Sequence, residues 1–231
     1  MFLLTRPYQQ SFAMSKALEG RGILCFIEPM LKVVALKKIT PKGYKTLIIT
    51  SRNTLDFLES LSFDMTIYCV GKFVEKSLKA KGIHNIYSFT SIVELLEFIK
   101  TKPSQSLGSI LYAAGESKTI DIEASLKPLG YLIQTKTLYK TETPKTLSLD
   151  LIKLLKNGEV RLISFFSKKT AETFVNLVKF HSLEFFCSSV ITISFSQNID
   201  NVLQELVWKK NIITKKSSMN SFWQVIKNHV G

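Results

Sequence analysis

One pattern of apolar and polar residues occurs twice along the chain. Thr46–Leu58 reads TLIITSRNTLDFL and Leu162–Phe174 reads LISFFSKKTAETF, so each copy is a short β-branched or aromatic run followed by a serine, Ser51 or Ser167. Apolar residues then recur at helical spacing, most clearly at i, i+3, i+4 and i+7 from Ala171. The pattern predicts a strand, a tight turn and a helix N-terminus in each copy.

The rest of the chain continues this alternation of strand-like and helix-like segments, which predicts an α/β protein with parallel sheets. Beside the two copies, the expected strands are Phe2–Thr5, Leu24–Glu28, Thr66–Val70, Ser109–Ala114, Tyr131–Thr143, Val190–Ile193 and Ile212–Ile213. The expected helices include Gln9–Leu18, a helix from Lys72, Ser91–Lys100 with a capping box of Ser91 and Glu94, Leu147–Lys156 and a last helix around Phe222 and Ile226.

Ligands of parallel α/β sheets bind beyond the carboxyl ends of the strands. The turns expected there are rich in small, hydroxyl and cationic residues, and they favour an anion held by backbone N–H groups. Their candidate binding residues are Thr5, Arg6, Ser51, Arg52, Asn53, Gly71, Lys72, Gly115, Glu116, Ser117, Lys118, Ser167, Lys168, Lys169, Ser194 and Ser196.

Plain structural roles remain open for several of these residues. Ser51 and Ser167 are also ordinary helix caps, and Gly71 is also an ordinary turn glycine. The turns contain no Ser-His-Asp set, no paired carboxylates and no Cys-His pair. The site therefore reads as one with few catalytic side chains.

Composition narrows the class of ligand. The chain has 231 residues, 45% of them hydrophobic, and a formal net charge of +13, which suits a polyanionic partner such as nucleic acid, a membrane surface or a multiply carboxylated small molecule. All but four of the 31 basic residues are lysines, scattered and without a nucleic-acid-binding motif, and such a bias also fits compositional drift. No nucleic-acid or membrane partner is expected.

Cofactor, metal and targeting signals are weak. Gly20 and Gly22 follow a helix instead of a strand, so they are not a dinucleotide fingerprint, and there is no P-loop. The cysteines and histidines show no metal spacing. The apolar runs are too short for a membrane span or a signal peptide. We therefore expect no cofactor, no metal and a soluble cytoplasmic protein.

Seven segments, in order and covering nearly the whole chain, resemble the uroporphyrinogen-III synthase family. They are LLTRP, GILCFIEP, IITSRNTLDF, CVGKFVEKSLKAKG, ILYAAGE, TLYKTE and SFFSKKTAETF. The resemblance implies a lyase that cyclises hydroxymethylbilane with inversion of the last pyrrole ring, through a spiro intermediate and without metal or organic cofactor. It marks Tyr139 as the residue closest to the chemistry.

The resemblance also implies a domain organisation that the repeat alone does not give. Two flavodoxin-like domains are expected, one inserted in the other: residues 1–32 with 144–231, and residues 39–135, joined by linker strands at 33–38 and 136–143. A monomer and a transient contact with the preceding pathway enzyme are also expected. Val74 and Ser194 depart from the family pattern, which has a hydroxyl residue and a glycine there.

Two other functions are compatible with the same features. The first is a two-domain α/β protein that binds a small polyanion without catalysis, and the second is a nucleic-acid binder attracted by charge. Production of isomer III from hydroxymethylbilane separates the enzyme from both.

Overall fold

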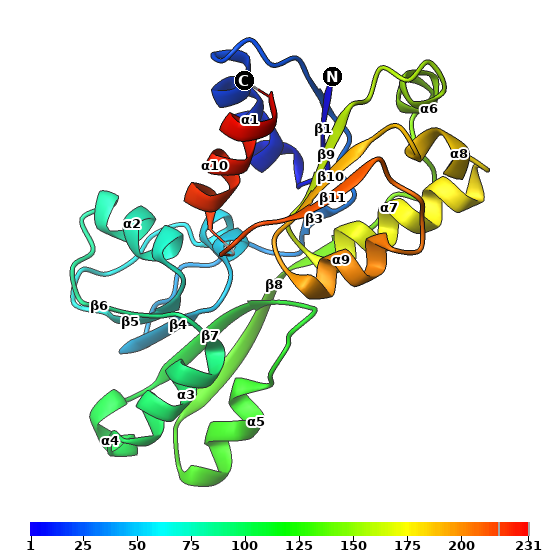
Figure 1. Cartoon of the computed structure of the whole chain (residues 1–231). Helices are drawn as coiled ribbons and strands as arrows, with labels where there is room; N and C mark the ends of the chain where they lie inside the picture. The colour runs from blue at the N-terminus through cyan, green and yellow to red at the C-terminus, as the bar shows by residue number, and fades with distance from the viewer. Residues whose placement is uncertain (217, 231) are drawn as a thin grey trace. The chain divides into compact units, whose positions relative to one another are not determined.

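The chain forms two compact units in a computed structural model that describes residues 1–216 and 218–230, with side chains up to residue 228 (Figure 1). Unit 1 is Met1–Lys32 with Glu142–Gly231, and unit 2 is Val33–Thr141. In the described part of the chain, no helix is long and apolar enough to cross a membrane.

The sheet of unit 1 has five parallel strands in the order β11-β10-β9-β1-β2. Numbered along the chain, this is the flavodoxin-like order 2-1-3-4-5. The residues of β1 and β9 are all buried, which explains their continuous apolar runs. The strands are β1 (Phe2–Leu4), β2 (Cys25–Ile27), β9 (Leu162–Phe165), β10 (Ile191–Ser194) and β11 (Lys210–Ile213).

Helices cover both faces of this sheet. Figure 1 shows α1 and α10 on one face and α7 and α9 on the other. The stripe predicted from Ala171 is confirmed, because Ala171, Phe174, Val175 and Val178 are all buried in one core cluster with the strands. The helices are α1 (Tyr8–Glu19), α6 (Leu149–Lys156), α7 (Lys168–Phe180), α8 (Glu184–Cys187), α9 (Gln197–Leu203) and α10 (Met219–Val230).

The sheet of unit 2 has six strands in the order β3-β8-β7-β4-β5-β6, and the pairs from β8 to β6 are parallel. The predicted α/β class is therefore confirmed, but the strand order here differs from the flavodoxin-like one. Leaving β3 aside, the order is 3-2-1-4-5, because the chain returns to the far side of β4 only after β6. The strands are β3 (Lys32–Ala35), β4 (Thr46–Ile49), β5 (Thr66–Val70), β6 (Ile86–Phe89), β7 (Ile110–Gly115) and β8 (Ile133–Glu142).

Unit 2 also has a core on each face of its sheet. One core packs η1 and α2 against the strands, and the other packs α3 and α5. Strand β3 covers part of the expected linker strand 33–38 and lies beside β8; the backbone N–H groups of Leu36 and Lys37 donate to the Leu138 carbonyl at 2.9 and 3.1 Å. The helices are η1 (Arg52–Phe57), α2 (Lys72–Ala80), α3 (Ile92–Lys100), α4 (Ser104–Leu107), α5 (Ile122–Leu126) and η2 (Lys127–Leu129).

Several elements differ from the sequence analysis, and two of them lie in unit 2 near β4 and β5. The helix expected after Ser51 is only the six-residue 3-10 helix η1. It ends because the next residues pair with Ile39, whose N–H donates to the Phe57 carbonyl and whose carbonyl accepts from Glu59, both at 3.0 Å. Strand β6 was missed, since its four residues, IYSF, mix apolar and polar types too briefly to show a period.

Candidate functional site

Each unit has one place where the chain reverses its direction of travel across the sheet. In unit 1 it lies between β1 and β9, and in unit 2 between β4 and β7. Such switch points open crevices at the carboxyl ends of the strands. The predicted turns follow the strand ends, so each unit has its own set of candidate residues. The unit 1 rim consists of Thr5, Arg6, Ser167, Lys168, Lys169, Ser194 and Ser196. The unit 2 rim consists of Ser51, Arg52, Asn53, Gly71, Lys72, Gly115, Glu116, Ser117 and Lys118.

Thr5 and Arg6 follow β1 at the unit 1 rim. The Thr5 hydroxyl is buried and donates to the Ser164 carbonyl at 2.8 Å, so it ties β1 to β9. The Arg6 guanidinium lies 4.3 Å from the ring centroid of Phe166, which follows β9. Arg6 is therefore the group of this pair that can meet a ligand.

Ser167 is the N-cap of α7. Its hydroxyl accepts from the Thr170 N–H at 3.2 Å, as the capping interpretation predicts. Lys168, the first residue of the helix, lies 3.5 Å from a carboxylate oxygen of Glu172. This turn therefore combines the N-terminus of a 13-residue helix with Lys168, whose charge Glu172 partly neutralises.

The two serines after β10 differ in exposure. Ser194 is fully buried and its hydroxyl is directed at the Ile212 carbonyl, 3.5 Å away. Ser196 is half-buried at the N-cap of α9 and makes no side-chain capping bond. Ser196 is the better placed of the two to contact a ligand.

Ser51, Arg52 and Asn53 begin the unit 2 rim after β4. The Ser51 hydroxyl accepts from the Asn53 N–H at 3.3 Å and caps η1. The Arg52 guanidinium stacks on the Phe73 ring, 3.8 Å from its centroid. Partial burial lowers the pKa of Arg52, while Asp56 raises it; an arginine remains charged at neutral pH in such a place.

Gly71 and Lys72 follow β5. Gly71 has φ of +92°, which suits glycine, and a Cβ there would meet nothing within 4 Å, so the space above it is open. The Lys72 ammonium is 3.0 Å from Glu75, which also binds Lys79 at 2.7 Å. These two lysines hold the pKa of Glu75 at about 2.

Gly115 ends β7 directly beneath the ring of Tyr139. A Cβ on Gly115 would lie 2.6 Å from Tyr139 Cζ, and the Phe57 ring stacks on Tyr139 with centroids 5.3 Å apart. The two strands pair here across a bulge, and the Glu116 N–H donates to the Tyr139 carbonyl at 2.9 Å. Tyr139 is 6% exposed, so its ring has a fixed place at the unit 2 rim.

Beyond Gly115 the chain enters an exposed turn. Glu116, Ser117 and Lys118 are all exposed there, before α5 begins. This turn brings one acid and one base to the end of β7, so it adds little net charge to the unit 2 rim.

The sequence analysis missed a buried tyrosine under the unit 2 rim. The Tyr112 hydroxyl lies 3.0 Å from the hydroxyl of Thr50, the residue directly before Ser51 in the chain. Burial raises the pKa of Tyr112, and Tyr139 adds to this effect electrostatically. The one sequence feature that could have indicated this buried hydroxyl is a tyrosine in the middle of an otherwise apolar strand.

Comparison with known proteins shows the family of this chain. A family model described as uroporphyrinogen-III synthase HemD matches residues 13–224. The chain belongs to the uroporphyrinogen-III synthase family. No curated protein sequence shows significant similarity to it.

Two solved structures of the family share the fold. Uroporphyrinogen-III synthetase from Helicobacter pylori is 16% identical, with a TM-score of 0.62 and coverage of 98% of each chain. A mutant uroporphyrinogen III synthase from Thermus thermophilus is also 16% identical, with a TM-score of 0.53, covering 100% of this chain and 98% of that one.

The residues at both departures from the family pattern, Val74 and Ser194, are buried. Val74 is 2% exposed and packs with the η1 and α2 core of unit 2. Ser194 is enclosed in the sheet of unit 1, as described above. Both positions therefore contribute to packing in this member of the family.

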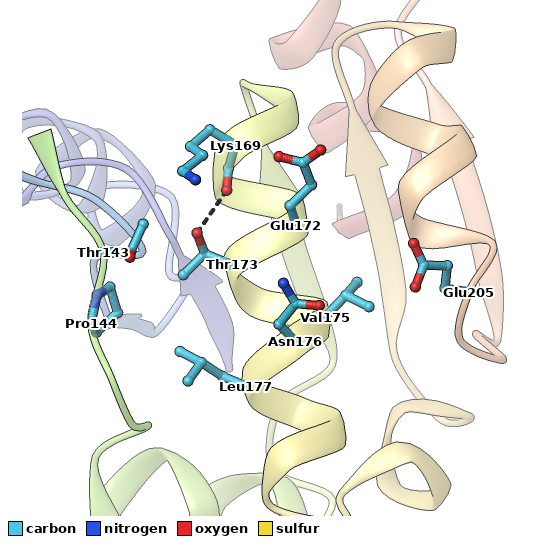
Figure 2. Close-up of a pocket in the computed structure, with 9 residues that line it drawn as sticks. All are labelled: Thr143, Pro144, Lys169, Glu172, Thr173, Val175, Asn176, Leu177 and Glu205. Atoms are coloured by element: carbon cyan, nitrogen blue, oxygen red, sulfur yellow. Dashed lines mark hydrogen bonds between the residues drawn. The ribbon is translucent and has the colours of Figure 1, made fainter. Parts of the chain in front are cut away.

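A pocket of about 400 Å³ lies along α7 in unit 1 (Figure 2). It shares only Lys169 with the candidate residues, and Figure 2 shows that side chain on the side of α7 that faces Thr143. Glu172 and Glu205 also line the pocket, and Glu205 is paired with Lys179 at 2.6 Å. Two carboxylates suit an anionic ligand poorly, so we do not place the family's substrate there.

Proposed function

We propose that this protein is an active uroporphyrinogen-III synthase. It would convert hydroxymethylbilane into uroporphyrinogen III and water, with inversion of the last pyrrole ring. The family match over residues 13–224 is the observation that carries this proposal. Three finer points rest on the family alone: a lyase reaction, a cytoplasmic location and a monomeric state.

The chemistry of the two rims supports a substrate with many carboxylates. Each rim has a hydroxyl residue followed by an arginine after a strand at the switch point of its sheet: Thr5-Arg6 after β1 and Ser51-Arg52 after β4. Arginine binds carboxylates with two parallel N–H donors, and N-terminal helix N–H groups add to this. We propose the predicted rim residues as the substrate-binding set, apart from Thr5 and Ser194, whose hydroxyls are used within the sheet.

Tyr139 is the proposed proton donor to the leaving hydroxyl group. The electron-rich pyrrole supplies the electron pair that expels the hydroxyl, and the proton converts it into water. A phenol can donate this hydrogen bond without being charged. Its fixed position between Gly115 and Phe57 supports the role, because a donor must be aligned before the reaction.

We also propose that the enzyme has two domains, residues 1–32 with 144–231 and residues 39–135, joined by linker strands at residues 33–38 and 136–143. The boundaries of the units, at Lys32 and Val33 and at Thr141 and Glu142, support this division.

The proposal is tested by incubating the pure protein with freshly prepared hydroxymethylbilane and separating the isomers of the product. Without enzyme the bilane closes to isomer I, so an excess of isomer III is the expected result. Isomer I alone, at the rate of a protein-free control, would contradict the proposal.

Ionic strength provides a second readout. If positive side chains attract the carboxylates, KM should rise with added salt, because salt screens exposed charges. A KM that does not change between low and high salt would argue against charge-based binding.

A further inference from the structure

We propose that Phe73 is a positioning residue that holds the Arg52 guanidinium at the unit 2 rim, where Arg52 binds one carboxylate of the substrate. The substrate's identity rests on the function proposed above. The role of Phe73 is an additional inference and has its own test.

The geometry of the pair is that of a cation–π contact. The guanidinium carbon of Arg52 lies 3.8 Å from the ring centroid of Phe73, and Phe73 is 50% exposed. A ring under one face of the guanidinium fixes its plane, while the N–H groups at its edge stay available. A carboxylate approaching in that plane would accept two of these hydrogen bonds.

The neighbouring charges leave Arg52 available. Among residues 1–216 and 218–230, no carboxylate lies within 4.0 Å of its guanidinium, and Asp56 acts on it only at longer range. Lys72, a cation of the same rim that follows β5, is already paired with Glu75. Arg52 is therefore the better candidate of the two for an incoming carboxylate.

The same arrangement recurs in unit 1. Arg6 follows β1, which borders the switch point of unit 1 as β4 borders that of unit 2, and it lies over a phenylalanine, Phe166, at 4.3 Å. A single exposed phenylalanine needs no explanation. An arginine on a phenylalanine at the same topological position in both units indicates a shared use.

The test compares Phe73→Leu in two backgrounds. In the wild type, losing the ring should raise KM for hydroxymethylbilane about two- to fivefold with kcat unchanged, as expected for one exposed cation–π contact. In an Arg52→Gln background the same change should have no further effect, because there is no guanidinium to position. Phe73→Tyr keeps the ring and should keep the wild-type KM.

Phe63→Leu is the matched control. Phe63 is also exposed, at 70%, but it precedes β5 and so belongs to the amino end of that strand. It should leave KM unchanged. An equal rise in KM for Phe63→Leu, or an equal effect of Phe73→Leu with and without Arg52, would overturn the proposal.

A second arm does not depend on turnover. Benzenehexacarboxylate binding is measured by titration calorimetry for the wild type, Phe73→Leu and Arg52→Gln. We expect weaker binding in both variants, with the larger loss for Arg52→Gln. Wild-type affinity in both would overturn the inference. If the wild type made no isomer III, the proposed function would fail while this arm still tested Arg52 and Phe73.

Discussion

The two copies of the repeated sequence pattern form different structures. Both place a serine after a buried strand, and both serines cap the next turn, at 3.3 Å for Ser51 and 3.2 Å for Ser167. After Ser167 the chain makes the 13-residue helix α7, whereas after Ser51 it makes only the six-residue 3-10 helix η1. The local pattern thus sets the turn, but it does not set the length of the helix.

Packing explains the difference in length. Along α7 the apolar residues form one continuous stripe that is buried against the unit 1 sheet. In the first copy, the backbone of Phe57 and Glu59 hydrogen-bonds to Ile39 instead of continuing a helix. Tertiary pairing therefore overrides the helical pattern where a neighbouring segment needs partners.

The difference matters for how each unit can hold an anion. Unit 1 offers the N-terminus of a full helix, with its macrodipole and free N–H groups. A short 3-10 helix offers less of this field, and unit 2 places Arg52 on Phe73 at that position. At the turn after the repeated strand, unit 1 thus has the end of a full helix, whereas unit 2 has an arginine on an aromatic ring.

The largest effect is expected from removing the Tyr139 hydroxyl, which tests whether unit 2 also supplies the proton donor. Tyr139→Phe keeps the ring and removes the hydroxyl, so the protein should fold normally and lose turnover by up to about 10²-fold. The measurement is kcat for isomer III together with the thermal unfolding midpoint.

Tyr131→Phe is the matched control for this change. The Tyr131 hydroxyl is bonded within unit 2 to the carbonyls of Ile99 and Lys102 at 2.9 and 2.8 Å. Its loss should lower stability and leave kcat unchanged. Full activity of Tyr139→Phe would mean that this tyrosine only packs in the core of unit 2. The proposal that it donates a proton to the leaving hydroxyl group would then be wrong.

Gly115→Ala should show that the Tyr139 ring is held by contact. The added methyl group would lie 2.6 Å from the ring, and overpacking of this kind typically destabilises by about 1–3 kcal/mol. In a Tyr139→Ala background, Gly115→Ala should cause no further loss of stability in denaturant unfolding, because the space is then vacated. If Gly115→Ala cost as much stability in that background as in the wild type, the glycine would be needed for another reason.

Removing the two serine caps gives the smallest effect and sharpens the comparison most. Ser167→Ala should destabilise the protein by about 0.5–2 kcal/mol, and Ser51→Ala by less, since fewer helical residues depend on that cap. Both variants should keep most of their activity. Equal losses of stability would mean that helix length is irrelevant here, and abolished turnover in a folded variant would make that serine catalytic.

Much of this fold follows from local sequence. The buried strands, the α7 stripe and the serine caps were predicted because each depends on residues within a few positions. Even so, the capping box at α3 differs in detail: Ser91 accepts from Glu94 N–H at 3.1 Å, but the Glu94 carboxylate accepts from Thr90 N–H at 2.8 Å.

The contacts that define the rims were out of reach. Arg52 on Phe73, and Tyr139 on Gly115, join segments far apart in the sequence, and each depends on which strands are neighbours. Spacing along the chain does not report strand order, and unit 2 departs from the order that the resemblance implied. The candidate turns could therefore be predicted, whereas their partners could not.

The central proposal is that the rim of each unit binds carboxylates of the substrate. The most direct measurement is KM for hydroxymethylbilane in Arg6→Gln and in Arg52→Gln, with the isomer of the product and the unfolding midpoint recorded for each. Hydrogen bonds to charged groups contribute about 1.5–3 kcal/mol, so each change should raise KM roughly tenfold or more in a folded protein that still makes isomer III. A wild-type KM in either variant would contradict the account, because the rim of that unit would then take no part in binding the substrate.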